Sequence, residues 1–329
     1  RRQRQMCIRD SLLACLLHDI GHAPFSHTCE NLFSYKEKIN NKNSKINKEL
    51  LAEIKSHLDD PAYHVFEKDY FSLIMKNPPA PHEIMSFIIT CRKFGDYNKF
   101  FESENINSLN LDLIVRSIIG CCYSYKRTDD EDKRLELGIK NCLIRLLNSS
   151  TVDVDKLDYI ARDTQMSGYD SIVLDNKRLL DNVCIVDNDG IYYPAFGKGA
   201  LSVLNNVVIA KNSQAKWIIN HPVVIYEAYL LCKAIGISLA NSGLRNTDNV
   251  VLSSDEIINF IFSSASLSKE GHQYFGGKFR LLSDVEILNL MKSHMEYSVV
   301  SEYFSRDERK SPVWKSSCLL YTSPSPRDR

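Results

Sequence analysis

The chain has 329 residues, of which 44% are hydrophobic, so it can bury a sizeable core, most plausibly in one large domain with an appended lobe. Its 41 basic residues balance its 41 acidic residues, so there is no global positive field and a role in coating nucleic acid is not expected. Ten cysteines are scattered without a CxxC pair, and the apolar stretch Val223 to Ala240 is interrupted by Glu227 and Lys233, which favours reduced thiols, a cytoplasmic location and no membrane span.

The first predicted element is a buried helix over Ser11 to Leu17, SLLACLL, which carries His18 and Asp19 at its C-terminal end. The sequence then runs to His27 as HDIGHAPFSH, in which Gly21 offers a helix stop. A His-Asp pair alone arises by chance in many chains. An imidazole beside a carboxylate at the rigid end of a core helix is nevertheless a suitable start for a divalent metal site, and two further histidines follow closely. The segment therefore predicts a metal-hydrolase site.

Helices are predicted for most of the next part of the chain. The polar stretch from Lys36 to Lys48, KEKINNKNSKINK, predicts a surface insertion. Apolar residues then recur every three to four positions in three segments, which predicts helices over His82 to Phe94, Leu111 to Cys122 and Asp132 to Leu147.

The segment from Thr151 to Asp170, TVDVDKLDYIARDTQMSGYD, is rich in Asp but also carries apolar residues at the spacing of one buried helical face. On such a helix Asp155, Tyr159 and Arg162 lie three to four residues apart, and Lys156 and Asp163 flank Tyr159 at similar spacings. One side therefore presents carboxylate, ammonium, phenol and guanidinium groups together. An isolated run of charges is usually a solvated helix face. Its combination with the His-Asp helix favours a second half of the same site.

The last part of the chain contains a predicted hairpin and further helices. Val183 to Ala195 alternates around an Asn-Asp-Gly turn, which predicts a short β-hairpin. Two apolar segments separated at Pro222 predict two helices. From about Ser316 onward the sequence resembles translated adapter sequence and is excluded from the fold prediction.

HDIGHAPFSH followed by VDVDKLDYIARD resembles the HD-domain superfamily of metal-dependent phosphohydrolases. Within it the motifs are most similar to the SAM-and-HD-domain deoxynucleoside triphosphate triphosphohydrolases and their dGTPase-like bacterial relatives, and a weaker similarity extends over Leu12 to Leu231. The resemblance implies a mostly α fold: an HD-domain helical bundle with a small β-hairpin over residues 1–245 and a C-terminal helical lobe over 246–315. Residues 316–329 are expected to be an adapter-derived tail.

The resemblance also implies a role for each matching residue. The ligands of a divalent ion (Mn, Fe, Mg or Zn) would be His18, Asp19 and Asp155. The catalytic histidines and their supporting carboxylate would be His22, His27, His82 and Glu30. The groups that contact the phosphates and sugar of a nucleotide substrate would be Lys156, Tyr159 and Asp163.

The implied reaction is attack at the α-phosphorus of a (deoxy)nucleoside triphosphate, which releases nucleoside and triphosphate, in a homo-oligomer. Two departures from the family pattern affect this expectation. The family has a further metal-binding His in an RFxHS-type motif upstream, whereas this chain starts at Arg1, seventeen residues before His18, so we expect an N-terminally truncated and impaired fragment. The family's substrate-reading His and Tyr fall on Ala215 and Ile219 if His221 is the aligned histidine.

Two alternatives stay open at the level of sequence. One is an HD phosphohydrolase that acts on a nucleoside monophosphate, a cyclic dinucleotide or guanosine tetraphosphate. The other is a catalytically silent nucleotide-binding regulator. The presence of His22, His27 and His82 favours activity, because a binding protein has no need of proton-transfer groups.

Overall fold

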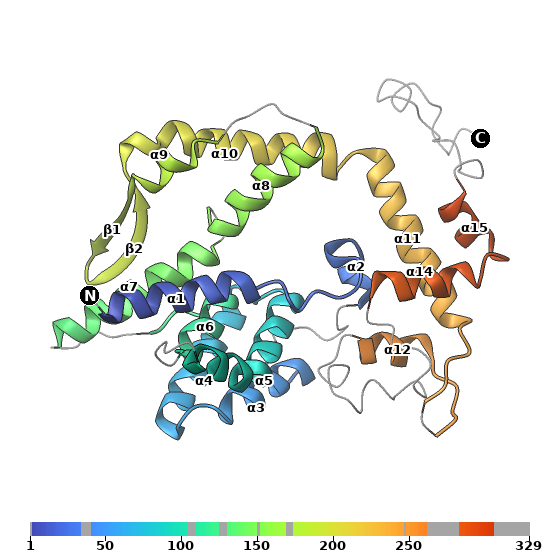
Figure 1. Cartoon of the computed structure of the whole chain (residues 1–329), viewed down its shortest axis with the longest axis horizontal. Coiled ribbons are helices and arrows are strands. Elements are labelled where there is room, and N and C mark those ends of the chain that lie inside the picture. Colours follow the sequence, from blue (N-terminus) through green and yellow to red (C-terminus); the bar gives the residue numbers. More distant parts are fainter. Residues whose placement is uncertain are drawn as a thin grey trace, which may run out of the picture.

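The computed structural model describes residues 2–33, 41–103, 109–124, 130–149, 152–168, 174–246, 248–261 and 283–305. In these ranges the chain is mostly helical, and its two named strands pair as one antiparallel hairpin. The predicted mostly α fold is therefore confirmed. Figure 1 shows one group of helices around α4 to α6 and a second group around α12, α14 and α15. In the same view α8 and α10 lie above the first group, and α11 runs from the end of α10 down into the second group.

A first hydrophobic core joins the helices at one end of the molecule. These helices are α1 (Arg2–Leu17), α3 (Lys45–Lys55), α4 (Asp60–Lys76), α5 (Pro81–Ser103) and α6 (Leu111–Ile118). Their apolar side chains, such as Phe66, Phe87 and Ile114, are fully buried. A buried ion pair connects α6 to α4, because the Arg116 guanidinium lies 2.9 Å from the Asp69 carboxylate. Such a pair is satisfied by partner charges rather than by water, so it specifies how the two helices pack.

A second hydrophobic core joins α2 (Ser26–Phe33) to the C-terminal part of the chain. Its other helices are α11 (Pro222–Ala240), α12 (Ser254–Ile261), α14 (Asp284–Lys292) and α15 (Ser298–Phe304). The described part of the predicted lobe is thus helical, and its apolar side chains pack on α2 and on α11. The division of the chain at residue 245 stays a prediction, and its last segment, 316–329, lies outside the described residues.

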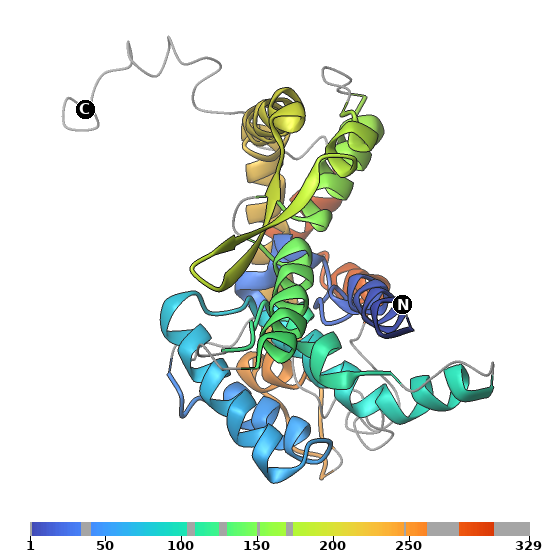
Figure 2. The same cartoon turned by 90° about the vertical axis from the view of Figure 1, so that its left-hand side faces the viewer.

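Beside and above the first core in the view of Figure 1 lie α7 (Glu131–Leu147), α8 (Val154–Met166), the short α9 (Asn176–Leu180) and α10 (Leu201–Gln214). The predicted hairpin is confirmed as β1 (Val183–Asn188) paired with β2 (Ile191–Phe196). Its two turn residues, Asp189 and Gly190, have φ values of 54° and 81°, the left-handed conformations that a two-residue turn between twisted strands requires. In the view of Figure 2 the hairpin extends beside α7, on which β2 packs.

The chain runs from α10 through a π-helical segment, Ala215–Ile219, into α11, and Pro222 occupies the first turn of α11 as predicted. Among the described residues, α11 is the helix long and apolar enough to cross a membrane by length and composition. Its C-terminal half packs in the second core through side chains such as Leu231 and Ile235. One such helix is weak evidence for a membrane span, because core helices pass the same test.

Two local predictions were wrong. The helix over residues 11–17 is not buried all round: Leu12 and Leu16 are 65% and 74% exposed, since α1 packs through one face only. The polar stretch predicted as a surface insertion contains the start of α3, where Ile46 and Asn47 are fully buried. Polar Asn47 is tolerated there because its amide oxygen accepts a hydrogen bond from the Tyr70 hydroxyl at 2.7 Å. Residues 34–40 of that stretch lie outside the described residues.

Candidate metal centre and cavity

The HD motif lies in the tight turn that follows α1, and Gly21 presses this turn against the start of α5. The Gly21 N–H donates to the Ser86 hydroxyl at 2.8 Å. A Cβ atom at Gly21 would lie 2.3 Å from the backbone nitrogen of Ser86 and 2.4 Å from the carbonyl oxygen of His82. No side chain can be accommodated at these distances, so glycine brings the HD turn and the His82 turn together.

A first cluster, which we call the ligand cluster, consists of His18, Asp19 and Asp155. His18 Nε2 lies 3.3 Å from Asp19 Oδ2 and 3.4 Å from Asp155 Oδ1. One nitrogen or oxygen from each residue lies within 4.8 Å of the other two. Ligands bound at about 2.1 Å to a shared ion are themselves roughly 3 to 4 Å apart. The ligand cluster therefore has the spacing of a divalent cation site.

The hydrogen bonds of His18 also fit a metal ligand. Its Nδ1 donates to the Cys15 carbonyl at 2.7 Å, so in the neutral ring the lone pair is on Nε2. That Nε2 atom is buried, and carboxylate oxygens of Asp19 and Asp155 face it at 3.3 and 3.4 Å. Asp155 is the main cause that raises the pKa of His18 to about 9, against the effect of burial. A divalent cation would meet the same need for positive charge between the carboxylates.

A second cluster, the histidine cluster, consists of His22, His27 and His82. The ring centroids of His22 and His82 are 4.1 Å apart in a stacked arrangement, and His27 meets both rings edge-on at 4.5 and 5.1 Å. Glu30 joins two of them, because its carboxylate accepts from His82 Nδ1 at 2.7 Å and from His27 Nδ1 at 3.2 Å. Burial opposes ionisation of Glu30, but these hydrogen bonds hold its pKa below the usual range.

Both clusters line one cavity of about 680 Å³, together with a face of α8. Its further lining residues are Ser26, Glu83, Ile118, Leu147, Asn148, Ser149, Asp153, Lys156, Tyr159, Arg162, Asp163, Gln214 and Ile219. Nine of the ten residues singled out from the sequence lie in this wall, and the tenth, Glu30, lies behind it on two histidines. The structure thus brings the two motifs together, while the role of each residue stays a prediction.

The residues on α8 are arranged as the helical spacing predicted, but the contacts of Lys156 were not foreseen. The Lys156 ammonium donates to the Ser149 carbonyl and to the carboxylate of Asp153, which also caps the start of α8. An ammonium has three N–H donors, and these contacts use two of them. The Lys156 ammonium therefore has one N–H donor left for an anion in the cavity, although the Asp153 carboxylate already balances part of its charge.

Sequence reasoning missed several wall residues that come from segments without a motif. Glu83 follows His82, and its carboxylate accepts from the Ala80 N–H and from the Asn148 amide, each at 2.6 Å. Burial raises the pKa of Glu83. Gln214 is almost fully buried and donates to Asp163 at 3.4 Å. The buried Gln at the end of an apolar helix was a signal that could have been used.

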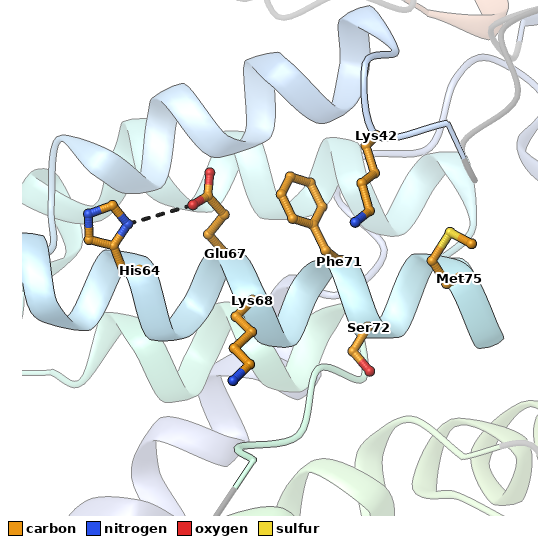
Figure 3. A pocket seen from close by; sticks show the side chains of 7 residues that line it. All are labelled: Lys42, His64, Glu67, Lys68, Phe71, Ser72 and Met75. Carbon is orange, nitrogen blue, oxygen red and sulfur yellow. Dashed lines mark ion pairs between the residues drawn. The ribbon is translucent and has the colours of Figure 1, made fainter.

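A second hollow of about 450 Å³ lies away from these clusters, on the outer face of α4 (Figure 3). Its lining includes Lys42, Lys68 and Phe71, and its one ion pair joins His64 to Glu67 at 3.7 Å. It is open to solvent and holds none of the convergent groups of the larger cavity. The larger cavity is therefore the candidate functional site.

Comparison with known proteins adds three distant relatives, and no family model matches the chain. The chain is 24% identical over 201 residues to the uncharacterized protein MG461 of Mycoplasma genitalium and 26% identical over 202 residues to the MG461 homolog of Mycoplasma pneumoniae. Each of these alignments covers 61% of the chain and 35% of the relative. The chain is also 29% identical, over 57% of its length and 28% of the relative, to L394 of Acanthamoeba polyphaga mimivirus, provisionally named an HD domain-containing protein.

The chain thus spans about a third of the length of these curated relatives. The similarity to L394 supports the HD superfamily and no narrower family. HD domains typically bind divalent metal ions, and the ligand cluster has the composition and spacing to hold one.

Proposed function

We propose that this protein is an HD-type, metal-dependent phosphohydrolase that converts (deoxy)nucleoside triphosphates to nucleoside and triphosphate. The observation that carries the proposal is the position of His18 Nε2, buried between the carboxylates of Asp19 and Asp155 at 3.3 and 3.4 Å. An imidazole nitrogen between two carboxylates requires positive charge, which is why Asp155 raises the pKa of His18. A divalent cation satisfies the nitrogen and both carboxylates at once.

His18, Asp19 and Asp155 would hold the cation, since an imidazole with two carboxylates suits Mn, Fe, Mg or Zn. When bound, the cation neutralises phosphate charge and makes a coordinated water more acidic. Its identity is part of the test below, because this set of donor atoms does not discriminate among these metals.

The histidine cluster would move protons. Glu30 accepts from Nδ1 of His27 and of His82, so both rings are held in the tautomer that leaves Nε2 free to take a proton. Burial lowers the pKa of His82, which keeps this ring neutral near pH 7. Neutral imidazoles can remove a proton from water and pass it to the leaving oxygen.

The charges of the cavity wall affect how a phosphate-bearing substrate can bind. The five carboxylates that line it are those of Asp19, Glu83, Asp153, Asp155 and Asp163. Against them stand Lys156 and Arg162. A nucleotide polyphosphate would be repelled by such a wall unless a divalent cation offsets the carboxylates. Binding of a phosphate-bearing substrate should therefore depend on the metal as strongly as turnover does.

A different nucleotide substrate has one observation in its favour. Ile219 lines the cavity where the resemblance to the triphosphohydrolases expects a tyrosine. An apolar side chain there cannot donate the hydrogen bond of a phenol. An HD phosphohydrolase acting on another nucleotide, or a nucleotide-binding regulator without turnover, is therefore the second candidate.

One assay separates these functions. The purified full chain is loaded with Mn²⁺ or Mg²⁺ and incubated with deoxynucleoside triphosphates, nucleoside monophosphates, cyclic dinucleotides and guanosine tetraphosphate. Products are identified by phosphorus NMR. Release of inorganic triphosphate that stops with a chelator supports the proposal, whereas turnover of another nucleotide supports the second candidate. Nucleotide binding without turnover in the presence of bound metal supports the regulator.

A matched pair of variants controls for activity from a contaminating phosphatase. Asp155→Asn should lose the activity, and Asp96→Asn, at an exposed carboxylate on α5 outside the cavity, should keep it. Equal activity of both variants would show that the ligand cluster is not the source of the turnover.

A further inference from the structure

Two cysteines from distant parts of the chain meet in the second core. Cys29 lies on α2 and is fully buried, and Cys232 lies on α11 and is partly exposed. Their Sγ atoms are 3.5 Å apart. The Cys232 thiol also lies 3.4 Å from the Thr28 carbonyl, to which it can donate.

Other cysteines that the structure describes lie elsewhere in the fold. Cys91, Cys121 and Cys142 are buried in other parts of the helical packing, and Cys184 is exposed on β1. Cys29 and Cys232 place one buried and one accessible sulfur in van der Waals contact across two helices. Such an arrangement is typical of a reactive thiol beside a resolving thiol.

We propose that Cys29 and Cys232 form a peroxide-responsive dithiol that closes to a disulfide between α2 and α11. The Cys232 sulfur attacks one oxygen of hydrogen peroxide, the O–O bond breaks, and Cys232 becomes a sulfenic acid as one water leaves. The Cys29 sulfur then attacks the sulfenic sulfur, the S–O bond breaks, and a second water leaves. Two thiols and one peroxide thus give one disulfide and two waters, with both sulfurs oxidised and the peroxide reduced.

The local environment assigns these two roles. A hydrogen bond from Cys29 lowers the pKa of Cys232 to about 7, so this sulfur is the more readily ionised nucleophile. The same hydrogen bond and burial raise the pKa of Cys29. Cys232 is also the one of the two that solvent reaches, so peroxide meets it first.

The geometry requires little movement. An S–S bond is about 2.05 Å long, so the sulfurs must approach by roughly 1.5 Å from their separation of 3.5 Å. Both helices already pack in the same hydrophobic core, and the shift can be shared between them. The bond would tether α2, which carries His27 and Glu30, to the helix that follows the cavity wall residue Ile219.

The test follows the sulfur chemistry and does not depend on the proposed hydrolase activity. The reduced full chain is treated with hydrogen peroxide, the remaining thiols are alkylated, and the protein is digested without reductant for mass spectrometry. We expect a cross-linked peptide pair of Cys29 and Cys232, lighter by two hydrogen atoms and separated again by dithiothreitol. Cys29→Ser and Cys232→Ser should lose the pair, and Cys184→Ser should keep it.

A comparison within the wild-type chain covers the case in which a serine variant fails to fold. In guanidinium the same treatment should give mixed pairings, while the native chain should give mainly the Cys29–Cys232 pair. Equal distributions in both states, or over-oxidation of Cys232 with Cys29 left free to alkylate, would overturn the proposal. In the oxidised native chain, amide hydrogen exchange of α2 should slow, and unchanged exchange there would exclude the tether.

Discussion

The ligand cluster and the histidine cluster share one cavity and similar residue types, yet they are built in opposite ways. In the ligand cluster a single imidazole faces two carboxylates, and its other nitrogen is held by a backbone carbonyl. In the histidine cluster three imidazoles meet one another, and a single carboxylate supports two of them from behind. The first arrangement gathers negative charge, and the second gathers groups that exchange protons.

The pKa shifts follow this difference. Asp155 raises the pKa of His18 to about 9, because a positive charge is favoured between the carboxylates. Burial lowers the pKa of His82, because no excess of negative charge compensates for its loss of solvent. The same residue type is thus favoured in its charged form in one cluster and in its neutral form in the other.

The largest expected effect tests the ligand cluster. Asp155→Ala should abolish both metal content and turnover, since it removes one of the two carboxylates that face His18 Nε2, and Asp19→Ala should do the same. Metal is measured by inductively coupled plasma mass spectrometry on the purified protein. Asp96→Ala serves as control. Full metal content in Asp155→Ala would mean that the cation lies elsewhere.

The next largest effect distinguishes the roles proposed for the two clusters. His27→Ala should keep the metal and slow turnover by roughly 10²- to 10⁴-fold, the usual loss when an acid or base is removed. The matched control is His64→Ala, at an exposed histidine on α4 outside the cavity. If His27→Ala instead loses the metal, then His27 is a ligand and the two clusters act as one metal centre.

A smaller effect is expected at Glu30. In Glu30→Gln the amide offers one oxygen acceptor, so only one of His27 and His82 keeps its partner, and the other ring faces an N–H donor. Loss of one charge-assisted hydrogen bond should slow turnover by roughly tenfold, with unchanged metal content. Glu131→Gln, at a carboxylate of α7 that is 87% exposed and lies outside the cavity, is the control. A variant as fast as wild type would show that the carboxylate does not orient these rings.

Sequence reasoning predicted the parts of the site that have a local signal. Helical spacing placed Asp155, Tyr159 and Asp163 on one side of α8, and the Asn-Asp-Gly turn predicted the β-hairpin. Asp153 and Lys156 have the i,i+3 spacing of a helix pair, but their contact depends on Asp153 being the N-cap of α8, and the sequence did not define where α8 begins. Gln214 is a polar residue at the end of an apolar helix, which marks it as unusual, but its place in this cavity wall follows from the packing of α10 on α8.

The structural role of Gly21 was also predicted wrongly. In the sequence it offered a helix stop, but α1 already ends at Leu17. The glycine is needed because the backbone of α5 occupies the space that a side chain would fill. Close approach between segments far apart in sequence depends on tertiary packing, and it produces no periodic pattern in the sequence.

The last prediction concerns stability, at the contact between the HD turn and α5. Gly21→Ala should destabilise the fold by about 1 to 3 kcal/mol, because its Cβ would overlap backbone atoms that cannot move aside without shifting α5. The matched control is Gly95→Ala on the same helix α5, where a Cβ meets nothing within 4 Å and should stabilise by up to about 1 kcal/mol. Urea unfolding measures both. Equal midpoints for the two variants would show that the HD turn does not need its contact with α5, and that the two clusters are held together by other means.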